Sequence, residues 1–237
     1  YRTMLRSNIS VAALAVAATV LAAIAAESPS PARASAPLTL YSVGSDVAVP
    51  HRGVLLLHAA PGSERVLARL NARTMFGSPM RLAVVGTSGD WLAVISAALG
   101  NRVRGFVHRS KVRLLHDPFS LEVDRSSRWI RVWRMGFVLR RFRVAVGAIA
   151  SPTPRGRFSI TDKLSNFMPS IYGCCTLALS GRQTRLARGW TGGDRLAIHA
   201  GSGIGGAVSN GCLRAAEADM RYLMEMLPLG TQVVVHD

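Results

Sequence analysis

The chain has 237 residues and a formal net charge of +16, and 49% of its residues are hydrophobic. This length fits two modest domains with additional segments. The basic residues are scattered through both halves and do not gather on one helix or stripe, which argues against nucleic-acid binding. The six histidines and three cysteines lack metal-ligand spacing, so no metal site is expected. An odd number of cysteines leaves at least one free thiol.

Residues 1–36 are predicted to form an export leader. Arg2 and Arg6 precede an uncharged run over 9–26, which is followed by proline, serine and small residues. This is the layout of a secretory signal peptide, although the run also reaches the lower limit for an uncleaved membrane anchor. Either interpretation places the rest of the chain outside the cytoplasm. There the anionic polymers of the cell envelope would attract a basic protein, although an ordinary solvated basic surface explains the charge equally well.

Residues 37–116 are predicted to form a small β-barrel domain. Apolar runs at 82–85 and 91–95 flank a tight turn, and two further short strands are expected at 101–107 and 112–115. The segment resembles bacterial SH3-like domains through Ala60-Pro-Gly62, the glycine and tryptophan pattern of 84–94, and Gly105-Phe-Val107. The resemblance implies a wall-binding or spacing module. A packed core without a ligand is the alternative interpretation.

Residues 117–237 are predicted to form the second domain. This domain begins with another β pattern. Apolar residues alternate with arginines on both sides of a turn at Met135-Gly136, which indicates an antiparallel hairpin. A helix is expected late in the chain, where Ala216, Met220, Leu223 and Leu227 recur with helical spacing. Pro228 and Gly230 would end it, and a closing strand is expected at 231–235.

The residues that carry chemistry lie between His199 and Arg214. His199 follows a short apolar strand, a glycine-rich loop comes next, and Cys212 is expected immediately before the helix. Such a loop can fold back so that a thiol and its base face one cleft. A helix N-terminus contributes too little to activate a thiol, so an imidazolium at His199 is expected to lower the pKa of Cys212. The amides of Gly211 and Cys212 would stabilise an oxyanion, and Arg214 would bind a substrate carboxylate.

The run from His199 through Ser209-Asn-Gly-Cys212-Leu-Arg214 closely resembles the signature of the YkuD-type L,D-transpeptidases, and Pro152-Thr-Pro-Arg-Gly-Arg-Phe158 matches an upstream motif of that family. The resemblance implies a mainly β fold: a β-sandwich catalytic domain with one helix after the catalytic cysteine. It implies no cofactor. The reaction would be acyl transfer from a tetrapeptide stem of peptidoglycan with loss of the terminal D-alanine, in the service of cell-wall synthesis and cell shape.

Carried over by position, the resemblance makes Cys212 the nucleophile and His199 the base. It implies that the backbone carbonyl of Ala200 orients the imidazole. The substrate and oxyanion residues are Ser209, Asn210, Gly211, Arg214 and Ala200. Ala200 stands where glycine is common and Asn210 where histidine or lysine is common, and the stretch between histidine and cysteine is short. These departures bear on substrate preference and loop geometry.

Two alternatives to the transpeptidase stay open at this point. The same acyl-enzyme would make an L,D-carboxypeptidase if water replaced an amine acceptor. A catalytically idle wall-binding protein is the other. The G-x-G-x-x-G pattern of 201–206 does not predict a dinucleotide site, because no helix opens at its last glycine within a βαβ unit.

Cys174 and Cys175 are expected to be non-catalytic. Because adjacent residues on a strand point to opposite faces, two separate thiols are favoured over a vicinal disulfide. Trp129, Tyr172 and Trp190 are more commonly buried than catalytic, and no role is assigned to them.

Overall fold

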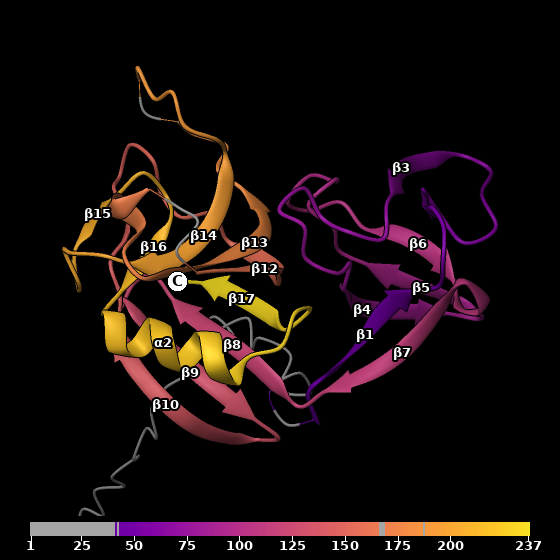
Figure 1. Ribbon diagram of the computed structural model, residues 1–237, viewed down its shortest axis with the longest axis horizontal. Coiled ribbons are helices and arrows are strands. Elements are labelled where there is room, and N and C mark those ends of the chain that lie inside the picture. Colours follow the sequence, from indigo (N-terminus) through magenta and orange to yellow (C-terminus); the bar gives the residue numbers. More distant parts are fainter. Residues whose placement is uncertain (1–40, 42, 166–168, 187) are drawn as a thin grey trace, which may run out of the picture. The chain divides into compact units, whose positions relative to one another are not determined.

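The computed structural model describes residues 41, 43–165, 169–186 and 188–237. The leader predicted at 1–36 therefore lies outside the described residues. Within the described ranges, no helix is both long enough and apolar enough to cross a membrane. The described chain is mainly β, as the sequence predicts, and its strands form two large sheets and a two-stranded one (Figure 1).

The first large sheet has seven strands in the order β3-β2-β6-β5-β4-β1-β7, all paired antiparallel. Its strands are β1 (Ser45–Pro50), β2 (Leu55–His58), β3 (Val66–Leu70), β4 (Leu82–Ser88), β5 (Trp91–Val94), β6 (Gly105–His108) and β7 (Val112–Asp117). The predicted strand-turn-strand unit is confirmed as β4 and β5. A 3₁₀ turn, η1 (Arg109–Lys111), precedes β7. Leu57, Leu82 and Leu92 are among the side chains in the core of this sheet.

The second large sheet has eight strands in the order β10-β9-β8-β17-β12-β13-β14-β16. Its strands are β8 (Phe119–Asp124), β9 (Trp129–Arg134), β10 (Phe137–Arg143), β12 (Gly156–Ser165), β13 (Cys175–Arg182), β14 (Arg195–Ala200), β16 (Leu213–Ala215) and β17 (Gln232–His236). The predicted hairpin is confirmed as β9 and β10, and Met135 and Gly136 turn the chain with positive φ. The closing strand is confirmed as β17, which pairs parallel to β8.

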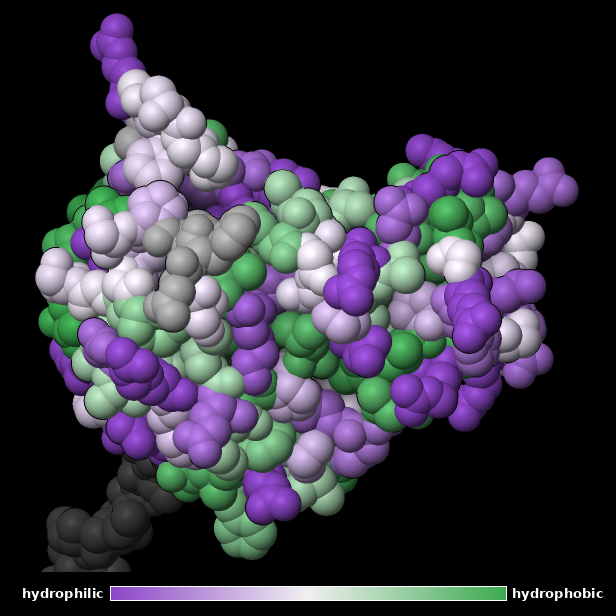
Figure 2. Space-filling view, in the orientation of Figure 1, coloured by the Kyte–Doolittle hydropathy of each residue, from purple (hydrophilic) through white to green (hydrophobic). Residues whose placement is uncertain are grey.

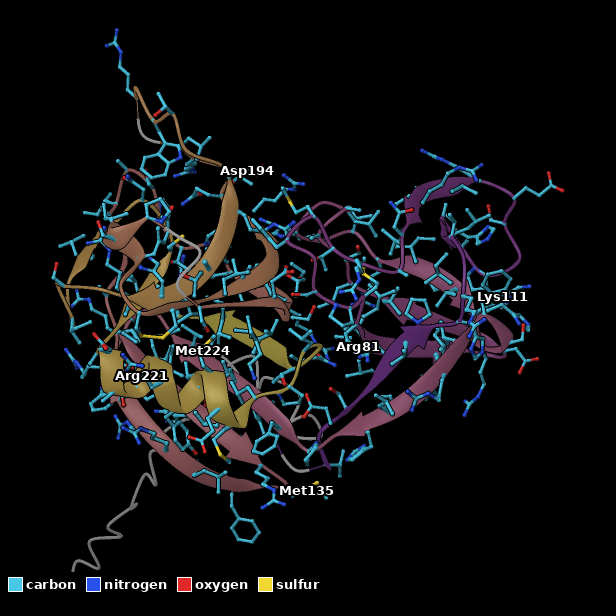
Figure 3. The ribbon with its side chains drawn as sticks, in the orientation of Figure 1. Arg81, Lys111, Met135, Asp194, Arg221 and Met224 are labelled. Carbon is cyan, nitrogen blue, oxygen red and sulfur yellow. A yellow bond between two sulfur atoms is a disulfide. The ribbon has the colours of Figure 1, made fainter. Side chains whose placement is uncertain are left out.

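Several features in and around this sheet position the candidate site. The edge strand β16 runs parallel to β14, whereas β13 and β14 run antiparallel. A short two-stranded sheet joins β11 (Val146–Gly147) to β15 (Ala207–Ser209), and a 3₁₀ turn, η2 (Ser170–Tyr172), leads into β13. The salt bridge from Arg182 to Asp194 joins the end of β13 to the start of β14, and Figure 3 labels Asp194 at that point.

The predicted late helix is confirmed as α2 (Glu217–Met226). It packs against β13 and β14, and the side chains of Met220 and Leu223 are fully buried there. Arg221 and Met224 mark the helix in Figure 3. One detail of the prediction is wrong: β16 lies between Cys212 and α2, so the cysteine does not stand at a helix N-terminus. The helix begins five residues after it.

Hydrophilic and apolar side chains are mixed on the surface. Figure 2 shows hydrophilic side chains spread over the visible face among apolar ones, without one continuous band.

Candidate active site

Strand register brings the candidate catalytic residues to one face of the sheet. In the parallel pair of β14 and β16, Ile198 is opposite Leu213 and His199 is opposite Arg214. Ile198 and Leu213 are fully buried in the core. Because side chains alternate along a strand, His199, Arg214 and the preceding Cys212 point to the opposite face. These three residues line one cavity of about 120 Å³.

His199 is held in one orientation by its neighbours. Its Nδ1 lies 2.8 Å from the carbonyl oxygen of Ala200, the contact that the family resemblance implies. Since a carbonyl only accepts hydrogen bonds, Nδ1 carries the proton and Nε2 keeps its lone pair. The ring of Tyr172 lies edge-on against the imidazole with centroids 4.8 Å apart. The base form of His199 is thus oriented before any substrate binds.

Burial lowers the pKa of His199 below its ordinary value near 6.5; the hydrogen bond to Ala200 opposes this shift, and the Arg214 guanidinium adds to it. Burial also raises the pKa of the Cys212 thiol, against a backbone hydrogen bond at Ala197 and the positive charge of Arg214. Both shifts favour the neutral thiol and the neutral imidazole. Their directions run against the expectation that an imidazolium at His199 lowers the pKa of Cys212.

Cys212 is half-buried and free, and its Sγ lies 3.9 Å from the carbonyl oxygen of Arg195. The loop before it is fixed by Ser209, which is 1% exposed. The Ser209 hydroxyl accepts a hydrogen bond from the Gly211 N–H at 3.1 Å and donates to the Cys212 carbonyl at 2.5 Å. The Gly211 amide is thus engaged inside the loop, which leaves the Cys212 amide as the other expected oxyanion donor.

Two further side chains hold this loop, and sequence reasoning missed both. Thr153 donates to the Gly211 carbonyl at 2.8 Å and accepts from the Gly147 N–H at 2.9 Å. Gln183 places its Nε2 3.1 Å from the Asn210 carbonyl. Thr153 belongs to the Pro-Thr-Pro motif, which was a signal that could have found it. Gln183 belongs to neither quoted motif.

Arg214 lies on β16 and not in the helix that was expected to begin directly after Cys212. It is half-buried and lines the cavity. No ion pair among the described residues includes its guanidinium. A guanidinium without a carboxylate partner in the described part of the chain is suited to binding an anionic group of a ligand.

Gly173 explains how the site accepts Ala200 where glycine is common. Gly173 has φ of +65°, and a Cβ placed on it would lie 2.6 Å from the Ala200 Cβ. The next two residues, Cys174 and Cys175, form a disulfide, so the expectation of two separate thiols is wrong. This crosslink lies at the start of β13, which begins at Cys175, and follows the segment that carries Tyr172.

The aromatic residues left without a role divide into two groups. Tyr172 and Trp190 line the cavity, and Nε1 of Trp190 donates to the Gly193 carbonyl at 3.1 Å. Trp129 instead lies beneath the guanidinium of Arg141, whose Cζ is 3.9 Å from the ring centroid.

Among the described residues, no cluster of three or more histidine, cysteine or acidic side chains has the arrangement of a metal site.

Comparison with known proteins identifies the family of this region. The model of the YkuD L,D-transpeptidase catalytic domain matches residues 118–235. A Bacillus licheniformis protein named YkuD is 30% identical over 121 residues, or 50% of this chain. Its name marks the L,D-transpeptidase activity as provisional. Its Bacillus subtilis counterpart is 29% identical over 119 residues, again 50% of this chain. The match spans 66% of the length of each relative.

Solved structures of L,D-transpeptidases are also similar to this chain. An Enterococcus faecium enzyme is 16% identical, with a TM-score of 0.42 over 65% of this chain and 74% of its own. An enzyme from Mycobacterium tuberculosis H37Rv is 17% identical, with a TM-score of 0.42 over 59% of this chain and 67% of its own. On the family match, residues 118–235 of this chain belong to the YkuD family of L,D-transpeptidase catalytic domains.

Proposed function

We propose that the protein is a peptidoglycan L,D-transpeptidase in which Cys212 is the nucleophile and His199 the base. The observation that carries the proposal is the placement of these residues. The parallel register of β14 and β16 presents both at one cavity, and the Ala200 carbonyl leaves Nε2 of His199 as the basic nitrogen. A thiol with an oriented base is the arrangement that covalent acyl transfer requires.

In the first half-reaction, Nε2 of His199 takes the thiol proton as Sγ of Cys212 attacks the carbonyl of the L,D peptide bond in a tetrapeptide stem. A bond forms between sulfur and carbon. The carbon–nitrogen bond to the terminal D-alanine then breaks, and the imidazolium returns its proton to the leaving amine. Because burial favours the neutral form of both groups, the thiol proton passes to Nε2 of His199 within this half-reaction.

The developing oxyanion needs a donor that the loop has not already used. Since the Gly211 N–H donates to Ser209, we assign this contact to the backbone amide of Cys212. Arg214 lines the same cavity and would bind a carboxylate of the stem peptide. Asn210 also lines the cavity, and its side chain would contact substrate at a position where the family commonly has histidine or lysine.

In the second half-reaction, an acceptor amine gives a proton to His199 and attacks the thioester. The new amide bond forms, the bond to sulfur breaks, and Cys212 regains its proton. Water in place of the amine would give the L,D-carboxypeptidase product. We propose the amine as acceptor, in keeping with the family, and residues 37–116 as the SH3-like module that would keep the enzyme on the anionic cell wall after export.

A mixture of the purified full-length chain and disaccharide-tetrapeptide, with and without an amine acceptor, tests the proposal by mass spectrometry. The expected products are free D-alanine and a crosslinked peptide that forms only with the amine. Loss of D-alanine without crosslinking would instead support the carboxypeptidase. An unchanged tetrapeptide, or equal turnover by Cys212→Ala, would contradict both enzymatic assignments and leave the wall-binding alternative.

A further inference from the structure

Gln183 is a buried glutamine whose side chain lies against the loop that carries the nucleophile. It directly follows β13 and is 7% exposed. Its Nε2 lies 3.1 Å from each of three carbonyl oxygens, those of Ser151, Pro152 and Asn210. Its Oε1 accepts a hydrogen bond from the Arg185 N–H at 3.0 Å. Both ends of the amide are therefore bonded to backbone, and none of these bonds involves another side chain.

The Asn210 carbonyl is the first of three consecutive backbone groups that buried side chains hold. Gln183 binds this carbonyl, Ser209 binds the following Gly211 N–H, and Thr153 binds the Gly211 carbonyl. The bonds from Gln183 and Ser209 hold the peptide plane between Asn210 and Gly211. The bond from Thr153 holds the next plane, between Gly211 and Cys212. The direction of the Cys212 N–H is set by the second of these planes, because the N–H and the Gly211 carbonyl belong to the same peptide unit.

Gly211 and Gln183 also fit each other sterically. Gly211 has φ of +112°, a conformation that residues with a side chain rarely adopt. A Cβ placed on Gly211 would lie 1.9 Å from Nε2 of Gln183. The glutamine amide thus occupies the space that a side chain at position 211 would take. The loop has its shape because a glycine and a glutamine are present together.

We propose that Gln183 is a positioning residue for acylation. Its amide holds the Asn210–Gly211 peptide so that the Cys212 thiol faces the carbon, and the Cys212 N–H faces the oxygen, of the same substrate carbonyl. This inference rests on the proposed function. A displacement of about 1 Å at a reacting group can reduce the rate about 100-fold. Loss of the glutamine amide is therefore expected to slow acylation even where the fold and the substrate contacts survive.

The alternative is that Gln183 only stabilises the fold, and Gln232 offers a matched control. Gln232 is 1% exposed and lies on β17, and its Nε2 donates to the Val84 carbonyl at 2.9 Å. It is thus the same residue type and is also buried, with its Nε2 bonded to backbone and its Oε1 accepting a hydrogen bond from the Arg157 guanidinium at 2.6 Å. Gln232 is absent from the lining of the cavity that contains Cys212. Any general cost of removing a buried amide should appear at both positions.

The experiment compares wild type, Gln183→Met and Gln232→Met as full chains that react with a carbapenem, used as a mimic of the acyl donor. Adduct formation at several carbapenem concentrations gives the maximal acylation rate and the half-saturating concentration. For Gln183→Met we expect the maximal rate to fall about 30- to 100-fold, with a half-saturating concentration within about 3-fold of wild type. Gln232→Met should lower the melting temperature yet keep the maximal rate within about 3-fold.

Gln183→Glu supplies a readout that a purely structural role would not move. An ionised carboxylate has no proton to donate to the three carbonyls, whereas the protonated acid has one. The rate of this variant relative to wild type should therefore rise as the pH falls from about 8 to about 6, because burial beside carbonyl oxygens favours the neutral acid. A ratio that stays flat over this range would count against the assignment.

Equal maximal rates for wild type and Gln183→Met, or an equal loss in Gln232→Met, would overturn the inference. Hydrogen exchange gives an independent measurement, and the amides of 210–212 should exchange faster in Gln183→Met than in either wild type or Gln232→Met. Failure of wild type to form any adduct would contradict the proposed function. The exchange data would then still decide whether Gln183 holds the loop.

Discussion

Replacement of Ser209 by alanine is the sharpest test of how the nucleophile loop is built. The Ser209 hydroxyl is 1% exposed and makes two hydrogen bonds, one from the Gly211 N–H and one to the Cys212 carbonyl. Alanine removes both and adds no new contact. A buried polar group that loses its partner costs about 1–3 kcal/mol, so two such groups, partly relieved by water, should cost about 2–4 kcal/mol of unfolding free energy.

For a folded unit of this size, each kcal/mol lowers the melting temperature by about 2–4 °C, so Ser209→Ala should melt about 5–15 °C below wild type. Ser120 provides the matched control. It is also 1% exposed, but its hydroxyl has no hydrogen-bond partner among the described residues. Ser120→Ala should therefore melt within about 2 °C of wild type or above it. Thermal unfolding of both variants, followed by circular dichroism, measures the difference. Equal melting temperatures for the two variants would refute the reasoning.

Four further outcomes follow from the site and the residues around it. Iodoacetamide should alkylate Cys212 at a rate that rises with pH and does not level off below about pH 9, because burial raises the thiol pKa; a plateau near neutral pH would instead reveal a thiolate. Acylation should persist on the acidic side of about pH 6.5, because burial keeps His199 neutral there, and loss of activity above that pH would contradict the direction of its shift. Arg214→Lys should weaken transpeptidation and leave the melting temperature within about 2 °C, whereas unfolding would show a structural role. Thiol titration of the unreduced, unfolded chain should find one free cysteine, and replacement of Cys174 and Cys175 by serine should leave turnover largely intact.

Sequence patterns predicted those parts of the fold that depend on local periodicity. The alternation around Met135-Gly136 predicted the β9–β10 hairpin, and the spacing of Met220 and Leu223 predicted α2, because each pattern reflects one buried face of one element. The start of α2 was predicted less accurately than the residues that it buries. Only three residues, 213–215, form β16, and such a short edge strand carries no periodic signal.

The residues that hold the site were predictable only where a motif named them. His199 and Cys212 stand in a signature, whereas Gln183 reaches the loop through the fold and has no local pattern to mark it. The disulfide between Cys174 and Cys175 was missed because only Cys175, the first residue of β13, belongs to the strand. Cys174 precedes it, so alternation along a strand does not govern both side chains. The pKa shifts also depend on burial, which only the assembled core determines.

The most direct test of the central claim is intact-protein mass spectrometry of wild type, Cys212→Ser and His199→Ala after exposure to a carbapenem. Wild type should gain one covalent adduct, and peptide mapping should place it on Cys212. His199→Ala should react far more slowly while it stays folded, because the base that accepts the thiol proton is gone. Cys212→Ser should gain none. An unmodified wild type, or an adduct on Cys174 or Cys175, would contradict the account.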